Sequence, residues 1–136
     1  MNEEVSQNLF LLEFPYKLTF DNKFNPTITH NGMNVPVSTL SDGEQARVDV
    51  VVLCSLFKLL KRRYPSINIF SADETISYLD PETSGYVLEF LKKFSQANNL
   101  NCFIVSHTDL YLDNFDEIIE VHKNMNGFST LTKSSL

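Results

Sequence analysis

The chain has 136 residues, a length that fits one domain able to bury a substantial core. Its 43% hydrophobic and 21% charged residues are typical of a soluble globular protein, and no apolar run reaches the roughly 18 residues that span a membrane. The net charge of −6 argues against a dedicated nucleic-acid surface on this chain alone, and its two cysteines, Cys54 and Cys102, lie in apolar runs where buried free thiols are expected.

The first 40 residues predict a lead-in followed by a small antiparallel sheet. Residues 1–13 are expected to form a short helix, a ragged lead-in or a coiled-coil stub, ended by Pro15. Three strands are predicted, at 16–20, 27–30 and 34–37. Asn31-Gly32 joins the last two and is the strongest short hairpin signal, because both turn positions require a positive φ.

Residues 44–64 predict one long helix, because they contain no Gly or Pro and repeat apolar residues at helical spacing. The run Val50-Val51-Val52 lowers the intrinsic helix propensity, so burial of this helix must compensate. Its last turn carries Lys61-Arg62-Arg63. These cations either offset the carbonyl dipoles at the helix end or form a small phosphate-contacting patch.

Two apolar runs, 67–72 and 102–105, predict buried parallel strands joined by a right-handed crossover. The helix between them is expected to begin at Asp80-Pro81, because Asp is a good N-cap and Pro suits the first helical position, and to close at 98–99. A helical turn at 108–112 follows. A second hairpin is predicted around Asn126-Gly127, and the tail at 133–136 is expected to fray.

The first candidate for chemistry is Ser41-Asp42-Gly43-Glu44, at the start of the long helix. Its spacing is that of a capping box, in which Ser41 and Glu44 satisfy each other's backbone N–H groups. The same geometry suits a γ-phosphate, because a helix N-terminus presents unpaired N–H groups and a positive dipole end. Gly43 would let the phosphate approach the backbone, and Ser41 would add a hydroxyl donor.

The second candidate, Asp73-Glu74, follows a predicted buried strand, where ligand sites in open parallel sheets lie. In nucleotide hydrolases the Asp of such a pair holds Mg²⁺, and the Glu orients or deprotonates the attacking water. The alternative is an acidic loop without a catalytic role.

His107 and Asp80 complete the set. His107 also follows a predicted strand and is placed to contact a γ-phosphate or the attacking water, or to be a satisfied boundary histidine. Asp80 is expected to cap its helix, with a second role at a subunit interface as a further hypothesis.

Together, in this order, the segments resemble those of ABC-type ATPases. Leu40-Ser41-Asp42-Gly43-Glu44 resembles the signature Leu-Ser-Gly-Gly-Gln/Glu, whose Glu variant is typical of SMC and SbcC-like DNA-repair ATPases. Residues 67–74 resemble Walker B, 79–80 the D-loop, 106–107 the switch-histidine loop, and the closing hairpin the end of such heads. No stretch reads Gly-x-x-x-x-Gly-Lys-Ser/Thr, the phosphate loop.

The resemblance covers residues 14–132 and implies an α/β fold. This fold is the C-terminal lobe of an ABC-type P-loop ATPase head, with a partly parallel sheet flanked by helices and antiparallel hairpins at both ends. In the family, an N-terminal lobe carries the phosphate loop, and two heads sandwich two ATP molecules.

Carried over to this sequence, the resemblance assigns the residues to two sites. Ser41 and Gly43, with Glu44, would contact the γ-phosphate held by the other head. Asp73 would serve Mg²⁺, Glu74 would be the catalytic base and His107 the γ-phosphate sensor of this head's own ATP. Asp80 would lie at the head–head interface.

Two residues depart from the family pattern. Asp42 replaces the first glycine of the signature, and a carboxylate near a γ-phosphate is unfavourable unless it points away. Thr75-Ile76 replaces the usual Pro-Thr after the acidic pair, which changes the shape of that loop more than its chemistry.

Our first hypothesis is therefore half of an SMC/SbcC-like ATPase for DNA repair or recombination, either a truncated piece or a split-gene product, inactive alone. Its cofactors, ATP and Mg²⁺, would be shared with the partner lobe. Its partners would be a Walker A lobe, a second head, a nuclease subunit and DNA. It suits a bacteriophage recombination endonuclease, in the host cytoplasm near the nucleoid.

Two other hypotheses stay open. The chain is alternatively a complete, non-catalytic ABC-like module that binds and regulates a host or cognate ATPase. The third reading is an ordinary α/β domain in which these motifs coincide by chance.

Overall fold

The computed structural model describes residues 1–12, 14–73, 76, 79–107 and 112–135. The helices are α1 (Asn2–Leu11), α2 (Asp42–Arg63) and α3 (Pro81–Asn98), with short 3-10 helices at Val37–Thr39 (η1) and Leu112–Asn114 (η2). The strands are β1 (Lys17–Phe20), β2 (Pro26–His30), β3 (Met33–Val35), β4 (Ile69–Asp73), β5 (Asn101–Val105), β6 (Glu117–Lys123) and β7 (Ser129–Ser135).

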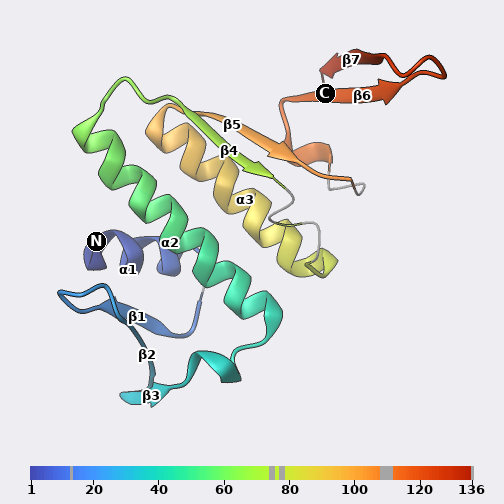
Figure 1. Ribbon diagram of the computed structural model, residues 1–136. Helices are drawn as coiled ribbons and strands as arrows, with labels where there is room; N and C mark the ends of the chain where they lie inside the picture. The colour runs from blue at the N-terminus through green and yellow to red at the C-terminus, as the bar shows by residue number, and fades with distance from the viewer. Residues whose placement is uncertain (13, 74–75, 77–78, 108–111, 136) are drawn as a thin grey trace.

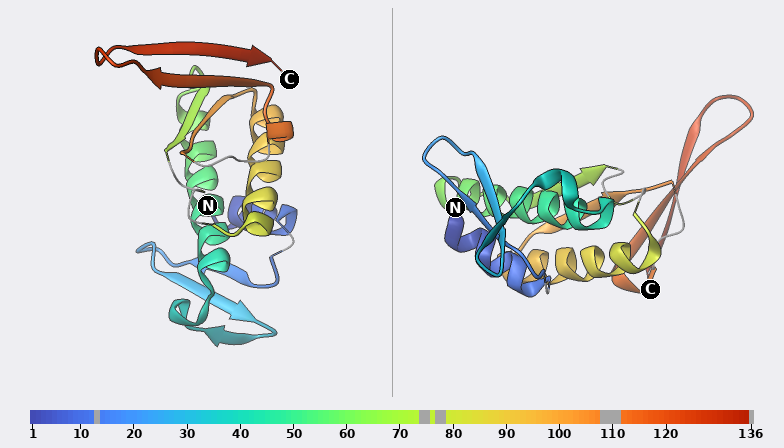
Figure 2. Two further views of the ribbon diagram at one scale, coloured as in Figure 1. Left: turned by 90° about the vertical axis from the view of Figure 1, so that its right-hand side faces the viewer. Right: turned by 90° about the horizontal axis from the view of Figure 1, so that it is seen from below.

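Helices α2 and α3 run side by side through the middle of the molecule (Figures 1 and 2). The parallel pair β4–β5 lies on one side of them, and α1 with the antiparallel sheet β1–β3 lies on the other. The core between these layers is rich in aromatic rings: Phe70 packs edge-on against Phe57 and Phe94, and Phe90 stacks on Phe94. Among the described residues, none of the helices combines the length and apolarity needed to cross a membrane.

The lead-in is a helix, α1, that docks on the C-terminal half of α2. Val5 and Leu9 of α1 are buried in the core. Glu4 is also buried, only 3% exposed, and forms ion pairs with Lys58, at 2.5 Å, and with Arg62. Because an isolated buried carboxylate would be costly, these two cations of α2 are what allow Glu4 to face the interior.

The basic trio that ends α2 also holds neighbouring helices. Lys61 Nζ donates hydrogen bonds to the carbonyls of Asn98, at 2.5 Å, and Asn99, at 3.2 Å, which are exposed at the C-terminus of α3. With Arg62 bound to Glu4, two of the three cations serve the packing of α1 and α3. These bonds differ from both predicted roles, because Lys61 and Arg62 bind α3 and α1 rather than the end of their own helix or a phosphate.

The first hairpin has the predicted turn. Asn31 and Gly32 have φ angles of 49° and 80°, which are the two positive values that a two-residue turn between twisted strands requires. The strands pair antiparallel, with His30 opposite Met33 next to the turn. Leu18 and Ile28, opposite each other in the β1–β2 register, point into the core.

Strands β4 and β5 are parallel, as predicted, but they are buried on one face only. Phe70 and Ala72 face the helices and are 4% and 6% exposed. On the other face, Ile69, Phe103 and Val105 are 57%, 49% and 45% exposed. The prediction of fully buried strands is therefore wrong for this face, because the described helices cover only the opposite side of the sheet (Figure 1).

The C-terminal hairpin differs from its prediction in two ways. Gly127 has a positive φ but Asn126 does not, so Asn126-Gly127 is not a two-residue turn. Instead, Asn124 Oδ1 accepts the N–H groups of Asn126 and Phe128, at 3.0 and 2.9 Å, and closes a longer loop. Residues 133–135 continue β7 in register with 117–119 rather than fraying, and Leu136 lies outside the described residues.

The cysteines are free thiols, as predicted. Cys54 is fully buried, and Cys102 is half-buried on β5. Burial raises the pKa of Cys54 to about 12 and that of Cys102 to about 11, so both are protonated at neutral pH.

Candidate functional site

Ser41 to Glu44 form the N-terminus of α2 and contain the predicted capping box. Ser41 is extended, and its Oγ accepts the N–H of Glu44 at 3.3 Å. Glu44 Oε2 accepts the N–H of Ser41 at 2.8 Å and its hydroxyl at 3.0 Å. The N–H of Ser41 is the main cause that lowers the pKa of Glu44, and the Ser41 and Tyr16 hydroxyls add to it. The segment is therefore an ordered helix end with its positive dipole directed outward.

Asp80 caps α3 in the same way. Its Oδ1 accepts the N–H of Thr83 at 3.0 Å, and Pro81 occupies the first turn. The hydroxyl of Thr83 is the largest cause that lowers the pKa of Asp80, followed by the Thr83 N–H. The predicted cap is thus present, and the N–H of Thr83 is its donor.

The two helix N-termini meet at Gly43. A Cβ atom on Gly43 would lie 2.9 Å from Oγ1 of Thr83 and 3.5 Å from Oδ2 of Asp80, so the backbones approach more closely than a side chain at 43 allows. A cleft of about 390 Å³ opens at this junction, and we call it the α2–α3 cleft. It is lined by Ser41, Asp42, Gly43, Glu44, Arg47, Leu79, Asp80 and Thr83.

The other predicted residues lie at the carboxyl edge of the parallel sheet. Asp73 ends β4 and pairs in register with Val105, the last residue of β5. His107 follows two residues later, so Asp73 and His107 come from neighbouring strand ends. Glu74 lies outside the described residues.

The structure thus divides the predicted residues into two groups. Ser41, Gly43, Glu44 and Asp80 share the α2–α3 cleft. Asp73 and His107, both within the described chain, do not line it. The helix N-terminus at Ser41 and the strand-end carboxylate of Asp73 therefore lie at different places in this chain.

Known proteins with similar sequences include subunits of bacteriophage exonucleases. The chain is 29% identical to exonuclease subunit 2 of Enterobacteria phage T4 over 79% of its length, and 26% identical to exonuclease subunit 2 of Escherichia phage RB69 over 98%. It spans only 19% and 24% of the lengths of those two proteins. No family model matches the chain.

Solved structures with the same fold include SMC heads. The SMC head domain from Thermotoga maritima superposes with a TM-score of 0.76 and 21% identity, over 99% of this chain and 47% of that domain. The chain therefore has the fold of the C-terminal lobe of an SMC head, and we call it the head lobe. The Smc head of Pyrococcus furiosus, solved bound to the C-terminal domain of ScpA, gives a TM-score of 0.70 at 18% identity, over 98% of this chain and 34% of that one.

The predicted α/β fold is therefore confirmed for the head lobe. Its partly parallel arrangement comes from β4–β5, and antiparallel hairpins lie towards both ends of the chain.

Asp73 is the residue that the sequence analysis assigned to Mg²⁺. Among the described residues, no group of three or more His, Cys, Asp or Glu side chains gathers to hold a metal ion. Mg²⁺ in nucleotide sites keeps several waters and takes one or two carboxylates together with phosphate oxygens. Asp73, a single carboxylate at a strand end, fits this partial role.

Sequence reasoning missed Arg47 and Thr83, which line the α2–α3 cleft. Arg47 lies one turn after Gly43, and its guanidinium sits 5.2 Å from the ring centre of Tyr86 on α3. The Arg47 Nε is buried and has no hydrogen-bond partner among the described residues. A local signal existed only for Thr83, which stands three residues after the Asp80 cap.

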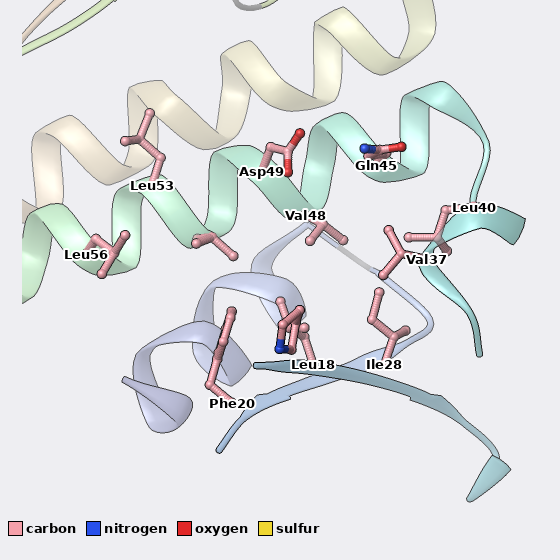
Figure 3. Close-up of a pocket in the computed structure, with 12 residues that line it drawn as sticks. Leu18, Phe20, Ile28, Val37, Leu40, Gln45, Val48, Asp49, Leu53 and Leu56 are labelled. Carbon is pink, nitrogen blue, oxygen red and sulfur yellow. The ribbon is translucent and has the colours of Figure 1, made fainter. Parts of the chain in front are cut away.

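The head lobe has a second cavity, of about 340 Å³, between α2 and the sheet β1–β3 (Figure 3). Its walls are mainly apolar, with Phe20 and Ile28 from the sheet facing Val48 and Leu56 from α2. Asp49 is the ionisable group of this wall among the described residues, and burial raises its pKa. None of the predicted site residues lines this cavity.

Proposed function

We propose that the head lobe supplies the signature, Walker B and switch-histidine segments of an SMC/SbcC-like ATPase, completed by an N-terminal Walker A lobe. The observation that carries this proposal is the one-sided burial of β4–β5. Parallel sheets occur almost only with both faces covered, yet Ile69, Phe103 and Val105 are about half exposed on the outer face. A partner lobe that extends the sheet would cover this face and bring a phosphate loop to its carboxyl edge.

In this proposal the α2–α3 cleft serves the ATP held by a second head. Ser41 would offer its hydroxyl, and the N-terminal N–H groups of α2 would face the γ-phosphate past Gly43. Glu44 would hold Ser41 in place through the capping box. Asp80, exposed at the rim of the same cleft, would lie at the head–head interface.

The strand-end residues would serve the ATP of the same head. Asp73 would hold Mg²⁺, which supplies charge neutralisation to the phosphates when it is bound. Glu74 would accept the proton of the attacking water, and His107 would contact the γ-phosphate. Asp73 ends β4, Glu74 comes next in the chain and His107 follows β5, so the carboxyl edge of one sheet would orient all three.

The likeness to phage exonuclease subunits suggests the biological setting. We propose that the assembled heads work with a nuclease subunit on DNA during repair or recombination, in the host cytoplasm. The chain's net charge of −6 suggests that most DNA contact belongs to partners rather than to this lobe.

The test is reconstitution with an N-terminal lobe that carries the phosphate loop. The head lobe alone is expected to show no Mg-ATPase activity, and the pair is expected to hydrolyse ATP. Glu74→Gln should abolish turnover while prolonging ATP-dependent pairing of heads, because substrate still binds but no base accepts the proton. Turnover by the pure wild-type lobe, or near-normal turnover by the Glu74→Gln pair, would refute the proposal.

The contact with the second head has its own variant. Ser41→Arg should block ATP-dependent pairing, because a long side chain would occupy the place of the γ-phosphate. Ser38→Arg, at an exposed position of η1 three residues earlier, is the matched control and should leave pairing intact. Equal pairing by the two variants would count against the role of Ser41.

Asp42 favours a second candidate, a regulatory module that binds an ATPase without responding strongly to nucleotide. The α2–α3 cleft is lined by three carboxylates, Asp42, Glu44 and Asp80, and by one cation, Arg47. This balance opposes a triphosphate. If Asp42→Gly creates an ATP response in a pair that lacks one in the wild type, the regulatory function is supported.

A further inference from the structure

We propose that Thr83 is a positioning residue that locks the Ser41–Glu44 segment to the first turn of α3, so that this segment and Asp80 move as one unit. The importance of this unit for catalysis rests on the proposed function, whereas the contact itself is a property of the chain alone. Thr83 belongs to none of the predicted motifs, and its one sequence signal is its place three residues after the Asp80 cap.

The first step is that Thr83 contacts both Asp80 and the backbone of Gly43. Thr83 is 5% exposed; its backbone N–H donates to Asp80 Oδ1 at 3.0 Å, and its hydroxyl is the largest cause that lowers the pKa of the Asp80 carboxyl. The same hydroxyl oxygen is the atom nearest to the place where a Cβ of Gly43 would lie, at 2.9 Å. Thr83 therefore takes part in the cap of α3 through its N–H, and its hydroxyl limits how closely α2 approaches.

A second contact one turn further along each helix supports the same junction. Arg47, four residues after Gly43, stacks its guanidinium over Tyr86, three residues after Thr83. Two contacts one turn apart on each helix prevent the α2 terminus from tilting about either contact alone. Ser84 adds weaker bonds, at 3.5 and 3.4 Å, to the carbonyls of Ile76 and Leu79, which tie α3 to the segment before Asp80.

This rigidity matters because the proposed phosphate contact is made across an interface. The groups at Ser41 and Gly43 must reach a nucleotide gripped by another head, and small misplacements of catalytic groups cost large factors in rate. If Asp80 meets the same partner head, a fixed spacing between Asp80 and Gly43 sets the position of the helix N-terminus at the moment of pairing. Thr83 sets that spacing without needing to touch the nucleotide.

The contact is tested on the isolated chain by a double-mutant cycle. In the wild type, Gly43→Ala should lower the melting temperature, because the new Cβ meets the Thr83 hydroxyl. In a Thr83→Ala background, Gly43→Ala should raise it, because the obstruction is gone and Ala favours the helix. A Gly43→Ala effect of equal sign and size in both backgrounds would overturn the proposed lock.

The positioning role is tested in the reconstituted head. Thr83→Val keeps the branched shape but removes the hydroxyl, and it should lower kcat about tenfold or more. The ATP concentration for half-maximal rate should stay unchanged, since the phosphate loop of the partner lobe still grips the nucleotide. Thr83→Ser should restore most of the turnover, because it keeps the hydroxyl.

Lys93→Ala, at an exposed position on α3, is the control and should match the wild type in both measurements. Unchanged kcat in Thr83→Val, or equal losses in Thr83→Val and Thr83→Ser, would overturn the positioning role. If the wild-type pair hydrolyses no ATP, the proposed function fails, and the chain-only cycle still decides whether Thr83 forms the lock.

Discussion

Removing the hydroxyl of Ser41 separates its capping role from its proposed role at the nucleotide. In the chain alone, Ser41→Ala deletes the bond from the Glu44 N–H to Ser41 Oγ and the bond from that hydroxyl to Glu44 Oε2. The bond from the Ser41 N–H to Glu44 Oε2, at 2.8 Å, remains. Loss of a Ser N-cap costs about 1 kcal/mol, which for a chain of this size corresponds to a fall in Tm of about 3–6 °C.

Thermal unfolding followed by circular dichroism at pH 7 measures this fall. Ser38→Ala, an exposed serine in η1, is the control and should melt within about 1 °C of the wild type. A Ser41→Ala melt that coincides with the control would refute the capping assignment. Because a folded domain has a stability of about 5–15 kcal/mol, the lost cap leaves the lobe folded. Loss of ATP-dependent pairing in this variant would then report on the phosphate contact.

The pH dependence of the same capping box follows from Glu44. Its pKa is lowered from the ordinary 4.5 by the Ser41 N–H, so its contribution is complete above the unfolded-state pKa and is lost as the pH falls through the folded-state pKa. The wild type should therefore be more stable than Glu44→Gln at pH 7, and the difference should shrink steadily below about pH 4.5. A difference that does not change between pH 7 and pH 3 would contradict this assignment.

Three further predictions concern stability and reactivity. Glu4→Gln should lower the free energy of unfolding by about 2 kcal/mol in a urea titration. The loss is moderate because Lys58 and Arg62, its two partners on α2, keep partial access to water. An unchanged free energy would mean that the ion pairs are absent. Asp49→Asn should raise Tm at pH 7 and have no effect below pH 3. Burial raises the pKa of the Asp49 carboxyl, so its charged form, present at pH 7, destabilises the folded chain. A lower Tm at pH 7 would contradict this. Cys54 and Cys102 should react slowly with a thiol reagent at pH 8 in the folded chain and fully in urea, and fast labelling of the native chain would refute their burial.

Features that depend on residues close together in the chain were readable from the sequence. The Ser41–Glu44 box, the Asp80 cap and the Asn31-Gly32 turn each involve up to four consecutive residues, whose side chains satisfy backbone groups in their own turn. The long helix and the parallel strands followed from apolar periodicity. The order of these local signals was enough to indicate an SMC/SbcC-like head lobe.

Two predictions made from short stretches of sequence were wrong, the Asn126-Gly127 turn and the frayed tail. Asn126-Gly127 carries the same dipeptide as the first turn, yet the side chain of Asn124 binds two backbone N–H groups and closes a different loop. The expected frayed tail pairs with β6, since each strand of a hairpin satisfies the backbone of the other.

What the sequence determined by itself was the main helices and strands and the caps of α2 and α3, because short-range sterics and hydrogen bonds act within a few residues. Tertiary structure alone decided which elements meet. The packing of Gly43 against Thr83 joins residues 40 positions apart in the chain, and the pairing of Glu4 with Arg62 joins residues 58 apart. The exposed face of β4–β5 likewise depends on which side of the sheet α2 and α3 cover. No repeating pattern within a short stretch of sequence predicts these contacts. They form only when the helices pack, and the packed side chains then fix the distance between the backbones.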